Sequence, residues 1–375
     1  EQVAKEIRKL ARMFKNVKVI TICGGVAEIH QEKSLSHGAH IIVGTPGRVL
    51  RLLKKDLLNL RMIKKFILDE GDRMLDMGFN DDIMDIASYL PTNRQSLLFS
   101  ATYPDEIKEL SESIQKDAVE VKVDIEHSPN IINQIFYELE RHQDKEEALL
   151  KILGNYKPDR LIVFCKTKQI TSDVAKFLNR SGIFAAGIHG DLQQNERTAV
   201  LTKFSNRSLS VLVATDVAAR GLDIQELAAV INYDLPTDPE IYIHRVGRTG
   251  RAGRNGLAFS FFIKKNRYKL DVIEKLIHEK CKVGDISELS TADKYDLIPP
   301  MKTMYISGGK KNNLRPGDIL GALVGEAGID SNDVGDISIF NILSYVAIKN
   351  ESIKQAIGKL KAGKIKNRKF KVGLV

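Results

Sequence analysis

Short apolar runs alternate with amphipathic stretches along most of the chain. In the first third, runs rich in β-branched and other apolar residues predict strands at Val17–Gly25, Ala39–Pro46, Lys64–Glu70, Gln95–Thr102 and Val119–Asp124. Stretches between them, such as residues 81–89 and 105–113, have the apolar spacing of helices. Strands that are apolar almost throughout and alternate with helices are typical of a parallel sheet covered on both faces. We therefore predict an α/β domain over residues 1–125.

The same alternation resumes after the polar, proline-containing stretch 126–130, which we interpret as a linker. Helices such as the one expected over residues 193–204 separate a second set of predicted strands. These strands are Asp159–Thr167, Ile183–Gly190, Leu209–Asp216, Leu227–Asp234 and Gly256–Phe262. No residue-level repeat is visible, but residues 131–283 look like a second copy of the same architecture. The predicted fold class is α/β, with two tandem parallel-sheet domains.

The last part of the chain has a different order of elements. Residues 284–300 are polar, end in two prolines and predict a linker. Residues 301–375 then read strand, helix, strand, strand, helix, strand, at residues 303–307, 315–327, 336–340, 343–348, 353–360 and 368–374. This order predicts a small α+β domain that resembles an RNA-recognition motif.

Composition and charge narrow the class of protein. The longest apolar runs are only as long as a strand, so we expect no membrane span. The charged start of the chain does not look like a signal peptide, and three scattered cysteines fit free thiols in a reducing cytoplasm. The net charge is +9, and residues 301–375 supply +7 of it, because they hold 13 Lys and Arg against 6 Asp and Glu. A basic segment beside a nearly neutral body indicates a nucleic-acid partner.

Polar clusters fall at the carboxyl ends of the predicted strands, where parallel sheets bind ligands. Asp69 and Glu70 follow an apolar strand, and paired carboxylates of this kind serve Mg²⁺ and water in phosphoryl transfer. Ser100 and Thr102 offer hydroxyls that Asp72 would accept from, if the two strand ends are neighbours. Each motif alone also fits a solvated turn or a helix N-cap.

The segment His244-Arg245-Val246-Gly247-Arg248-Thr249-Gly250-Arg251 is the most basic motif of the second half. If it is helical, His244, Arg248 and Arg251 share one face, and the two guanidiniums would reach the same phosphate. A solvated basic face is the alternative. The acidic Asp69–Asp72 segment upstream favours the first interpretation, with a nucleoside triphosphate between a basic and an acidic site.

Two further segments lie where phosphate or ribose would approach. Thr45-Pro46-Gly47-Arg48 places a proline in a first helical turn, whose free N–H groups bind phosphate. Thr215 and Asp216 come just before Gly221 and Asp223 and add a hydroxyl, carboxylates and a glycine. Any strand-to-helix turn has some of these features, so the order of the motifs carries more weight than any one of them.

In that order the motifs resemble those of DEAD-box RNA helicases of superfamily two, through both predicted sheet domains. The matching residues are Gly24-Gly25, TPGR at 45–48, the box at 69–72, SAT at 100–102, QNER at 194–197, ATDVAARGLD at 214–223 and HRVGRTGR at 244–251. The tail, with GGKKNNLRPGDILGAL at 308–323 and AGKIKNRKFKV at 362–372, is similar to the RNA-binding domain of the DbpA branch of that family. The resemblance implies two RecA-like domains, the first one incomplete, and a small RNA-binding domain.

The resemblance also implies roles for residues. Asp69 would hold Mg²⁺ through water, Glu70 would position or deprotonate the attacking water, and Arg248 and Arg251 would meet the γ-phosphate of ATP. Asp223, beside Gly221, would contact the ribose. Coupling of the ATP and RNA sites would fall to Asp72, Ser100, Thr102 and His244. The RNA path would be lined by Gly24, Gly25, Thr45, Gly47, Arg48, Arg197, Thr215 and Asp216.

Two departures from the family pattern stand out. Gly71 replaces the usual alanine of the box, and we expect activity to survive this change. No GxxxxGK[ST] phosphate loop precedes the box; the segment Gly358–Lys364 fits the spacing, but Ile365 follows where a hydroxyl is required. The start of the chain suggests a fragment of a protein that carries the loop upstream. The fragment would then hydrolyse ATP poorly, and its first domain would expose apolar surface.

In the tail, basic side chains are better candidates for RNA contact than the rings. The rings of Tyr305, Phe340 and Tyr345 would stack on bases or pack in the core, while the strand around Tyr345 lacks the usual base-stacking signature. The basic candidates are Lys310, Lys311, Arg315, Lys364, Lys366, Arg368 and Lys369. His30, His37 and His40 look like surface residues, because no cluster completes a metal site around them.

The leading hypothesis is an ATP-dependent, monomeric RNA helicase that opens short duplexes locally. The resemblance to the DbpA branch implies a hairpin of the large-subunit ribosomal RNA as its target and a role in ribosome assembly. The alternative is a non-catalytic RNA-binding protein that has lost its phosphate loop. A motor acting on DNA is a third hypothesis, which the RNA-type tail disfavours.

Overall fold

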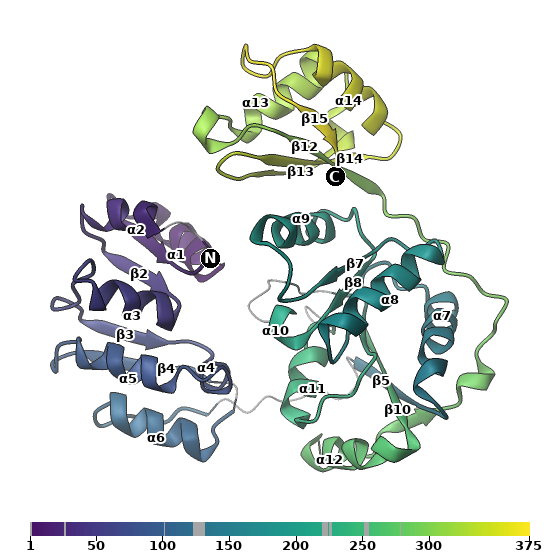
Figure 1. Cartoon of the computed structure of the whole chain (residues 1–375), viewed down its shortest axis with the longest axis horizontal. Helices are drawn as coiled ribbons and strands as arrows, with labels where there is room; N and C mark the ends of the chain where they lie inside the picture. Colours follow the sequence, from purple (N-terminus) through teal and green to yellow (C-terminus); the bar gives the residue numbers. More distant parts are fainter. Residues whose placement is uncertain are drawn as a thin grey trace. The chain divides into compact units, whose positions relative to one another are not determined.

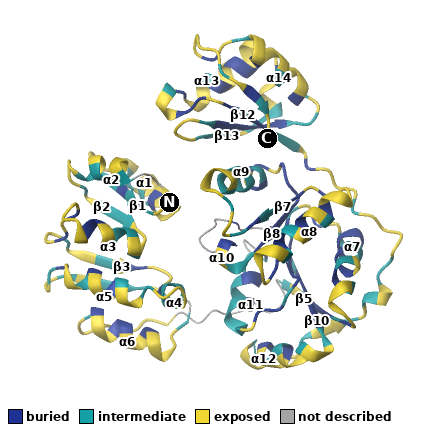
Figure 2. Ribbon diagram, viewed as in Figure 1, coloured by how far each residue is buried: buried dark blue, intermediate teal, exposed yellow. Residues whose placement is uncertain are grey.

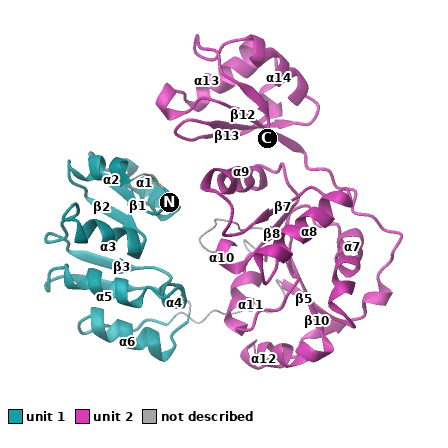
Figure 3. Ribbon diagram, in the orientation of Figure 1, with its two compact units in different colours: residues 1–126 teal, residues 127–375 magenta. Residues whose placement is uncertain are grey.

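The structure is a computed structural model that describes residues 2–25, 28–100, 102–122, 132–219, 224, 227–250, 255–277 and 279–375 (Figure 1). Contacts divide the chain into two compact units, residues 1–126 and residues 127–375 (Figure 3). No helix among the residues described is long and apolar enough to cross a membrane.

The first unit contains two separate pairs of parallel strands instead of one continuous sheet. β1 (Val19–Ile22) pairs with β2 (Ile41–Gly44), and β3 (Lys65–Leu68) pairs with β4 (Gln95–Leu98). Around them lie α1 (Gln2–Leu10), α2 (Glu28–Leu35), α3 (Pro46–Lys54), α4 (Gly71–Asp76), α5 (Asn80–Ser88) and α6 (Asp105–Ile114). All four strands and the helices α5 and α6 lie where the apolar pattern predicts them.

Two expectations for this unit are wrong. Residues 119–122 of the predicted strand Val119–Asp124 form no strand, and residues 123 and 124 lie outside the described part. Val119 is 86% exposed, so the alternating valines have no neighbouring strand or helix against which to pack. The β3–β4 pair is also not covered on both faces: Leu68 is buried against helices, whereas Ile67 is 55% exposed.

The second unit begins with a parallel sheet of seven strands in the order β11-β5-β10-β9-β6-β8-β7. The strands are β5 (Ile132–Leu139), β6 (Leu161–Phe164), β7 (Ala185–Ile188), β8 (Val211–Ala214), β9 (Ala229–Asn232), β10 (Gly256–Ile263) and β11 (Lys282–Gly284). The helices are α7 (Lys145–Tyr156), α8 (Lys168–Arg180), α9 (Gln194–Ser205), α10 (Asp216–Ala219), α11 (Pro239–Val246) and α12 (Arg267–Ile277). The apolar pattern predicts five of these strands and misses β5 and β11.

The centre of this sheet explains why its strands are apolar throughout. Every residue of β6, β8 and β9 is buried, with one hydrophobic cluster on each side of these strands. Figure 2 shows the buried residues of the second unit in dark blue. Helices on both faces leave no solvated side for polar residues, as expected for parallel sheets. The carboxyl ends of these strands therefore remain as the edge where polar side chains gather.

The rest of the second unit is a four-stranded antiparallel sheet in the order β13-β14-β12-β15. The strands are β12 (Met301–Ile306), β13 (Val334–Ile339), β14 (Ser344–Lys349) and β15 (Val372–Leu374). The helices α13 (Pro316–Gly321) and α14 (Ile353–Ala362) share one apolar core with one face of this sheet. The predicted order of elements is correct. The last strand is shorter than predicted, because residues 368–371 belong to a loop.

Candidate nucleotide and RNA sites

In the first unit, the DEGD segment and the SAT segment meet at the carboxyl ends of β3 and β4. The two strands are parallel neighbours, and two hydrogen bonds continue the pairing past their ends. The N–H of Phe99 donates to the carbonyl of Leu68, and the N–H of Gly71 donates to the carbonyl of Phe99. These hydrogen bonds bring residues about thirty positions apart in sequence into contact. The structure therefore joins the carboxylates and the hydroxyls that sequence analysis placed at one sheet edge.

Asp72 is the centre of this contact. Its Oδ2 accepts hydrogen bonds from both the N–H and the hydroxyl of Thr102, each at 3.2 Å. Ser100 behaves differently from the expectation, because its Oγ accepts the main-chain N–H of Asp72 at 3.1 Å and does not donate to the carboxylate. The expected Asp72–Thr102 hydrogen bond is present, and any shift of the 100–102 segment would disturb the start of α4.

Glu70 is held in an unusual backbone conformation next to this contact. Its φ of 56° and ψ of 50° are left-handed, a region that non-glycine residues rarely adopt and that often marks functional sites. The side chain is half exposed and forms an ion pair with Arg73, with 2.9 Å between Nη1 and Oε2. The left-handed turn directs the chain from β3 into α4 and leaves Asp69 and Glu70 exposed at the end of the strand.

The donor set at this edge fits Mg²⁺ bound largely by water and phosphate. Asp69 and Glu70 supply hard carboxylate oxygens, which Mg²⁺ prefers. Within the described residues, no group of three or more His, Cys, Asp or Glu side chains forms a protein cage for a metal. One or two carboxylates are the usual protein contribution to a magnesium ion that binds together with a nucleotide.

A second cluster lies at the carboxyl ends of β1 and β2. Gly24 and Gly25 follow β1, and Gly25 has a φ of 76°, which suits glycine. Thr45 follows β2, donates its N–H to the carbonyl of Ile22 and directly precedes α3, whose first residue is Pro46 as predicted. The glycine pair and the TPGR segment therefore lie at the same edge of the β1–β2 sheet.

Arg48 of the TPGR segment is part of a charge cluster around Glu28. The Glu28 carboxylate pairs with Arg51 at 3.1 Å, with Arg48 at 3.6 Å and with Lys55. The hydrogen bond from Lys55, together with the charges of Lys55 and both arginines, holds the pKa of Glu28 below its usual value, although burial acts in the opposite direction. Glu28 was not singled out in the sequence, because nothing in the local pattern shows that three cations of α3 and its end turn toward α2.

In the second unit, Arg245 organises the carboxyl ends of β8 and β9. It binds Asp216 with two hydrogen bonds, of 2.6 and 2.8 Å, and donates through Nη1 to the Asn232 side chain at 2.9 Å and to the carbonyl of Asp234 at 2.7 Å. Its guanidinium also lies 4.9 Å from the centre of the Phe164 ring. Because Arg245 is only 3% exposed, this charge needs all of these partners.

Sequence analysis did not single out Arg245, although it lies in the quoted octamer. Its neighbour His244 is partly exposed, whereas Arg245 faces the interior, where its partners come from other strands. The Asp216 carboxylate, expected on an RNA path, is engaged by Arg245. Asp234 in turn accepts a hydrogen bond of 2.5 Å from the buried Lys145, so the network reaches the start of α7.

The expectation of one helical face for His244, Arg248 and Arg251 is wrong in the described part. Helix α11 ends at Val246, so His244 is helical and Arg248 follows the helix. Gly247 caps the helix, and Gly250 has a φ of 66°, which a continuing helix excludes. Arg248 is partly exposed at this turn. Arg251, Gly221 and Asp223 lie outside the described residues.

Thr215 and Arg197 both contact Ala218 of α10. Thr215 follows β8 and accepts the N–H of Ala218 through its hydroxyl at 3.4 Å. Arg197, in the first turn of α9, donates to the carbonyl of Ala218 at 2.6 Å. These contacts place the QNER and ATD segments together at the carboxyl end of β8.

The basic candidates of the tail lie in two neighbouring loops of the C-terminal domain. Lys366 donates to the carbonyl of Asn313 at 3.0 Å and pairs with Asp318 at 3.4 Å, which joins the loop after α14 to the loop before α13. The hydrogen bond from the N–H of Arg315 and the charge of Lys366 lower the pKa of Asp318. All seven basic side chains are exposed; they are Lys310, Lys311, Arg315, Lys364, Lys366, Arg368 and Lys369. We call this set the basic face. The rejected phosphate-loop match at 358–364 falls largely within α14.

Replacing Gly71 with alanine is expected to stabilise the first unit. A Cβ at this position would meet Ile107 at 3.4 Å and Leu98 at 3.6 Å, which are ordinary contacts, and alanine reduces the entropy of the unfolded chain. G71A should raise the free energy of unfolding by about 0.4–1 kcal/mol. Urea titration with hydrogen exchange of peptides from residues 28–114 measures it. Gly78→Ala is the matched control and should destabilise, because φ there is 75°. A loss of stability in G71A would contradict the packing described.

Removing Arg245 is expected to destabilise the second unit strongly. Arg245→Ala leaves Asp216 and Asn232 without their buried partner, a loss that costs about 3–5 kcal/mol in comparable buried pairs. Arg267→Ala is the control, because its ion pair with Glu138 is exposed and worth less than about 1 kcal/mol. Hydrogen exchange of residues 211–246 against urea concentration compares the two variants. Equal and small decreases in stability in the two variants would show that the hydrogen bonds of Arg245 do not stabilise the second unit.

Family models match three parts of the chain. The DEAD/DEAH box helicase model matches residues 1–110, the helicase conserved C-terminal domain residues 144–253, and the DbpA RNA binding domain residues 303–374. Among solved structures, Dbp5 of S. cerevisiae bound to RNA and ADP BeF3 is similar with a TM-score of 0.68 and 33% identity, over 76% of this chain and 75% of that one. Mss116p bound to ssRNA and AMP-PNP has a TM-score of 0.66 and 25% identity, over 76% and 61%.

Two curated relatives span the chain. The ATP-dependent RNA helicase DbpA of Escherichia coli is 42% identical over 375 residues, which is all of this chain and 81% of the relative. The protein of the same name from Bacillus subtilis is 34% identical, over 99% of this chain and 81% of the relative. With the motifs assembled at the sheet edges and an RNA-binding domain at the end, the chain belongs to the DEAD-box family of ATP-dependent RNA helicases, in its DbpA branch.

Proposed function

We propose that Asp69, Glu70 and Asp72 divide the work of ATP hydrolysis in the first unit. Asp69 would hold Mg²⁺ through water, and Mg²⁺ when bound would neutralise charge on the phosphate oxygens. Glu70 would position the attacking water and accept its proton, for which its exposed carboxylate at the strand end is suited. The Asp72–Thr102 hydrogen bonds, with Ser100, would transmit the state of the nucleotide to the neighbouring strand. The meeting of these residues at one sheet edge is the observation that carries the proposal.

The second unit would contribute cations and ribose contacts to the same reaction. Arg248 and Arg251 would stabilise charge on the γ-phosphate, as arginine fingers do in phosphoryl transfer. Asp223, beside Gly221, would contact the ribose, and His244 would couple the nucleotide to RNA. Arg245 supports these roles indirectly, because its hydrogen bonds fix the ends of β8 and β9 just before the Arg248 turn.

RNA would bind both helicase units and the basic face. The backbone path would include Gly24, Gly25, Thr45, Gly47, Arg48, Arg197, Thr215 and Asp216, for which glycines and helix starts allow a close approach of phosphates. For the basic face we propose a hairpin of the large-subunit ribosomal RNA, which makes ribosome assembly the process served. This target rests on the likeness to the DbpA relatives. We further propose a monomer that acts in the cytoplasm and opens short duplexes locally.

ATP turnover by these 375 residues alone should be slow. They contain no GxxxxGK[ST] segment between a strand and a helix to cradle the β- and γ-phosphates. The alternative function, a non-catalytic RNA-binding protein, follows if no phosphate loop belongs to the protein at all. RNA-stimulated ATP hydrolysis by the chain, with and without a phosphate-loop domain supplied in cis, separates the two.

Replacing Glu70 tests the proposed chemistry. In a protein that joins these residues to a phosphate loop, Glu70→Gln should lower RNA-stimulated turnover at least about 100-fold, because a general base contributes 10²–10⁴-fold. ATP-dependent retention of RNA should remain, since glutamine keeps the size of the side chain. Glu106→Gln, on the exposed side of α6, is the control and should turn over normally. Full turnover in the Glu70 variant would remove that residue from the reaction.

Salt dependence tests the basic face. If Lys310 and Lys311 bind phosphates, the double alanine variant should bind structured RNA more weakly. The slope of its log affinity against log salt concentration should become less steep by about 0.7–0.9 for each phosphate that is no longer neutralised. Lys176 and Lys354, exposed lysines outside the basic face, form the control pair. An unchanged slope in the Lys310/Lys311 variant, measured by fluorescence anisotropy, would exclude these lysines from RNA binding.

A further inference from the structure

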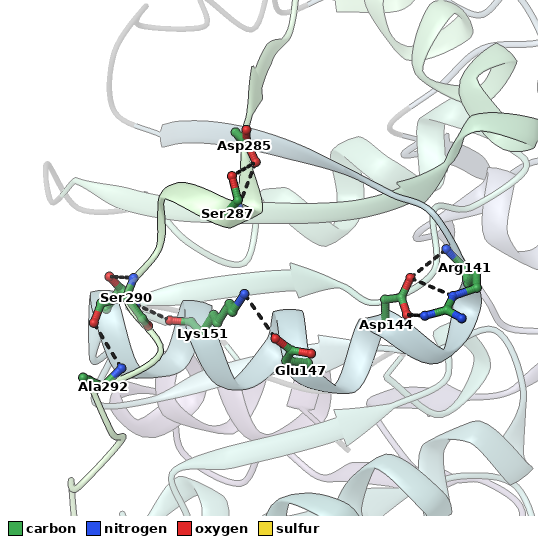
Figure 4. A network of polar contacts seen from close by, with 9 residues as sticks. Arg141, Asp144, Glu147, Lys151, Asp285, Ser287, Ser290 and Ala292 are labelled. Atoms are coloured by element: carbon green, nitrogen blue, oxygen red, sulfur yellow. Dashed lines mark hydrogen bonds and ion pairs between the residues drawn. The ribbon is translucent and has the colours of Figure 1, made fainter.

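The segment that links the helicase fold to the C-terminal domain is packed against α7. Asn155 makes two hydrogen bonds with the main chain of Ser290, at 2.9 and 3.2 Å, and Tyr295 donates to the carbonyl of Pro158 at 2.8 Å. Ile286, Leu289 and Tyr295 pack on the core of the parallel sheet. Figure 4 shows the segment from Asp285 to Ala292 passing the end of α7 near Lys151. Residues 285–296 are therefore a docked strap, although their polar composition predicts a linker.

The close approach of the strap depends on one glycine. A side chain at Gly154 would collide with the main-chain oxygen of Asp293, because a Cβ there would lie 2.0 Å from it. The far end of the strap is held by the C-terminal domain, where Asn350 donates through Nδ2 to the carbonyl of Pro299 at 2.7 Å. The strap is thus attached to both of the domains that it joins.

A second contact joins the same two domains directly. On β12, Met304 and Ile306 face the helices of the C-terminal domain, so the alternation of side chains directs Thr303 to the opposite, outer face of the sheet. Thr303 is nevertheless only 2% exposed. Its hydroxyl lies 2.9 Å from Nδ2 of Asn206 and 2.8 Å from Oγ of Ser208, two residues at the end of α9 that are also buried.

The end of α9 is shaped for this contact. Arg207 adopts a left-handed φ of 62° between Asn206 and Ser208, which lets both neighbours turn their side chains toward Thr303. Lys203, one turn earlier, reaches the carbonyl of Val375 at 3.4 Å, and Val375 in turn donates its N–H to the carbonyl of Thr303. Buried polar groups that satisfy one another across a contact favour one relative arrangement over many.

We propose that the end of α9 is a docking surface for the outer face of the C-terminal sheet, and that this surface and the strap hold the two domains as one rigid body. Within the second unit, the side chains of Asn206 and Ser208 are therefore hydrogen-bonded to Thr303 of the same chain. If the C-terminal domain binds RNA as proposed above, RNA held there moves together with the second helicase domain. A freely tethered domain would capture RNA without constraining the helicase domain.

Disulfide trapping in the full chain tests this docking. Ser208→Cys and Thr303→Cys place two thiols where hydroxyls are 2.8 Å apart, within reach of a disulfide. Cys23 and Cys281 are changed to serine, while the buried Cys165 is kept, because burial raises the pKa of its thiol well above the usual range. The control pair is Ser208→Cys with Lys354→Cys, which lies on the helical side of the C-terminal domain.

The rates of the two cysteine pairs distinguish a docked C-terminal domain from a flexibly tethered one. A docked domain should form the 208–303 disulfide at least about 100-fold faster than the control pair under oxidised glutathione. A flexible tether would give both pairs a similar effective concentration, in the millimolar range, and similar rates. Rates within a few-fold of each other would overturn the proposal.

A distance measurement covers the case in which the cysteine variants fold poorly. Spin labels on cysteines introduced at Arg180 and Lys354, two exposed positions on the two domains, should give one narrow distance distribution in the chain in which Cys23 and Cys281 are serine. The Asn206→Ala/Thr303→Val variant should broaden it, whereas Ser205→Ala, an exposed neighbour on α9, should not. A broad distance distribution in the chain that keeps Asn206 and Thr303 would likewise overturn the proposal.

Discussion

Parallel pairing of strands is the constraint on which the rest of this molecule depends. In a parallel sheet all carboxyl ends lie along one edge, so segments far apart in sequence deliver their polar side chains to the same place. Asp72 and Thr102 meet in this way across β3 and β4, and Arg245 and Asp216 meet across the larger sheet. Neither contact has a local cause in the sequence. Both follow from the order in which apolar strands pair.

The two units secure their polar edges differently. In the first unit a partly exposed carboxylate, that of Asp72, accepts the main-chain N–H and the hydroxyl of Thr102, beside a left-handed Glu70. In the second unit a nearly buried guanidinium is saturated by a carboxylate, an amide and a carbonyl. A partly solvated contact can be remade at modest cost, whereas a buried charge cannot lose a partner without a large decrease in stability. We infer that the first edge is the more adaptable of the two.

Periodicity in the sequence predicts the elements that pack on their own chain neighbours. The strands with continuous apolar runs, the helices α5, α6 and α9, and the order of elements in the C-terminal domain are correct for this reason. Two features required tertiary information: the valines at 119 and 121 have strand character but no partner, and β11 is too short to stand out. The end of α11 at Val246 has a local cause, because a glycine follows. The strap resembles a linker in sequence because its few apolar side chains pack on a domain that lies earlier in the chain.

Motifs were a better guide to the site than periodicity, since they report chemistry directly, but they did not reveal partners. The box, the hydroxyls of SAT and the basic residues of the tail stand out in the sequence as candidates, whereas Glu28, Lys145 and Arg245 do not. Their importance comes from burial and from the residues across from them, such as Asp216 for Arg245.

Mapping of RNA crosslinks tests the central claim most directly. Uridine-rich RNA that contains a hairpin with a single-stranded flank is irradiated with the chain, and the crosslinked peptides are identified by mass spectrometry. The account predicts crosslinks at the carboxyl-end loops of the helicase units, around residues 24–25, 45–48 and 215–216, in addition to the two loops of the basic face. Crosslinks confined to the C-terminal domain, or found at the amino ends of the parallel strands, would contradict it.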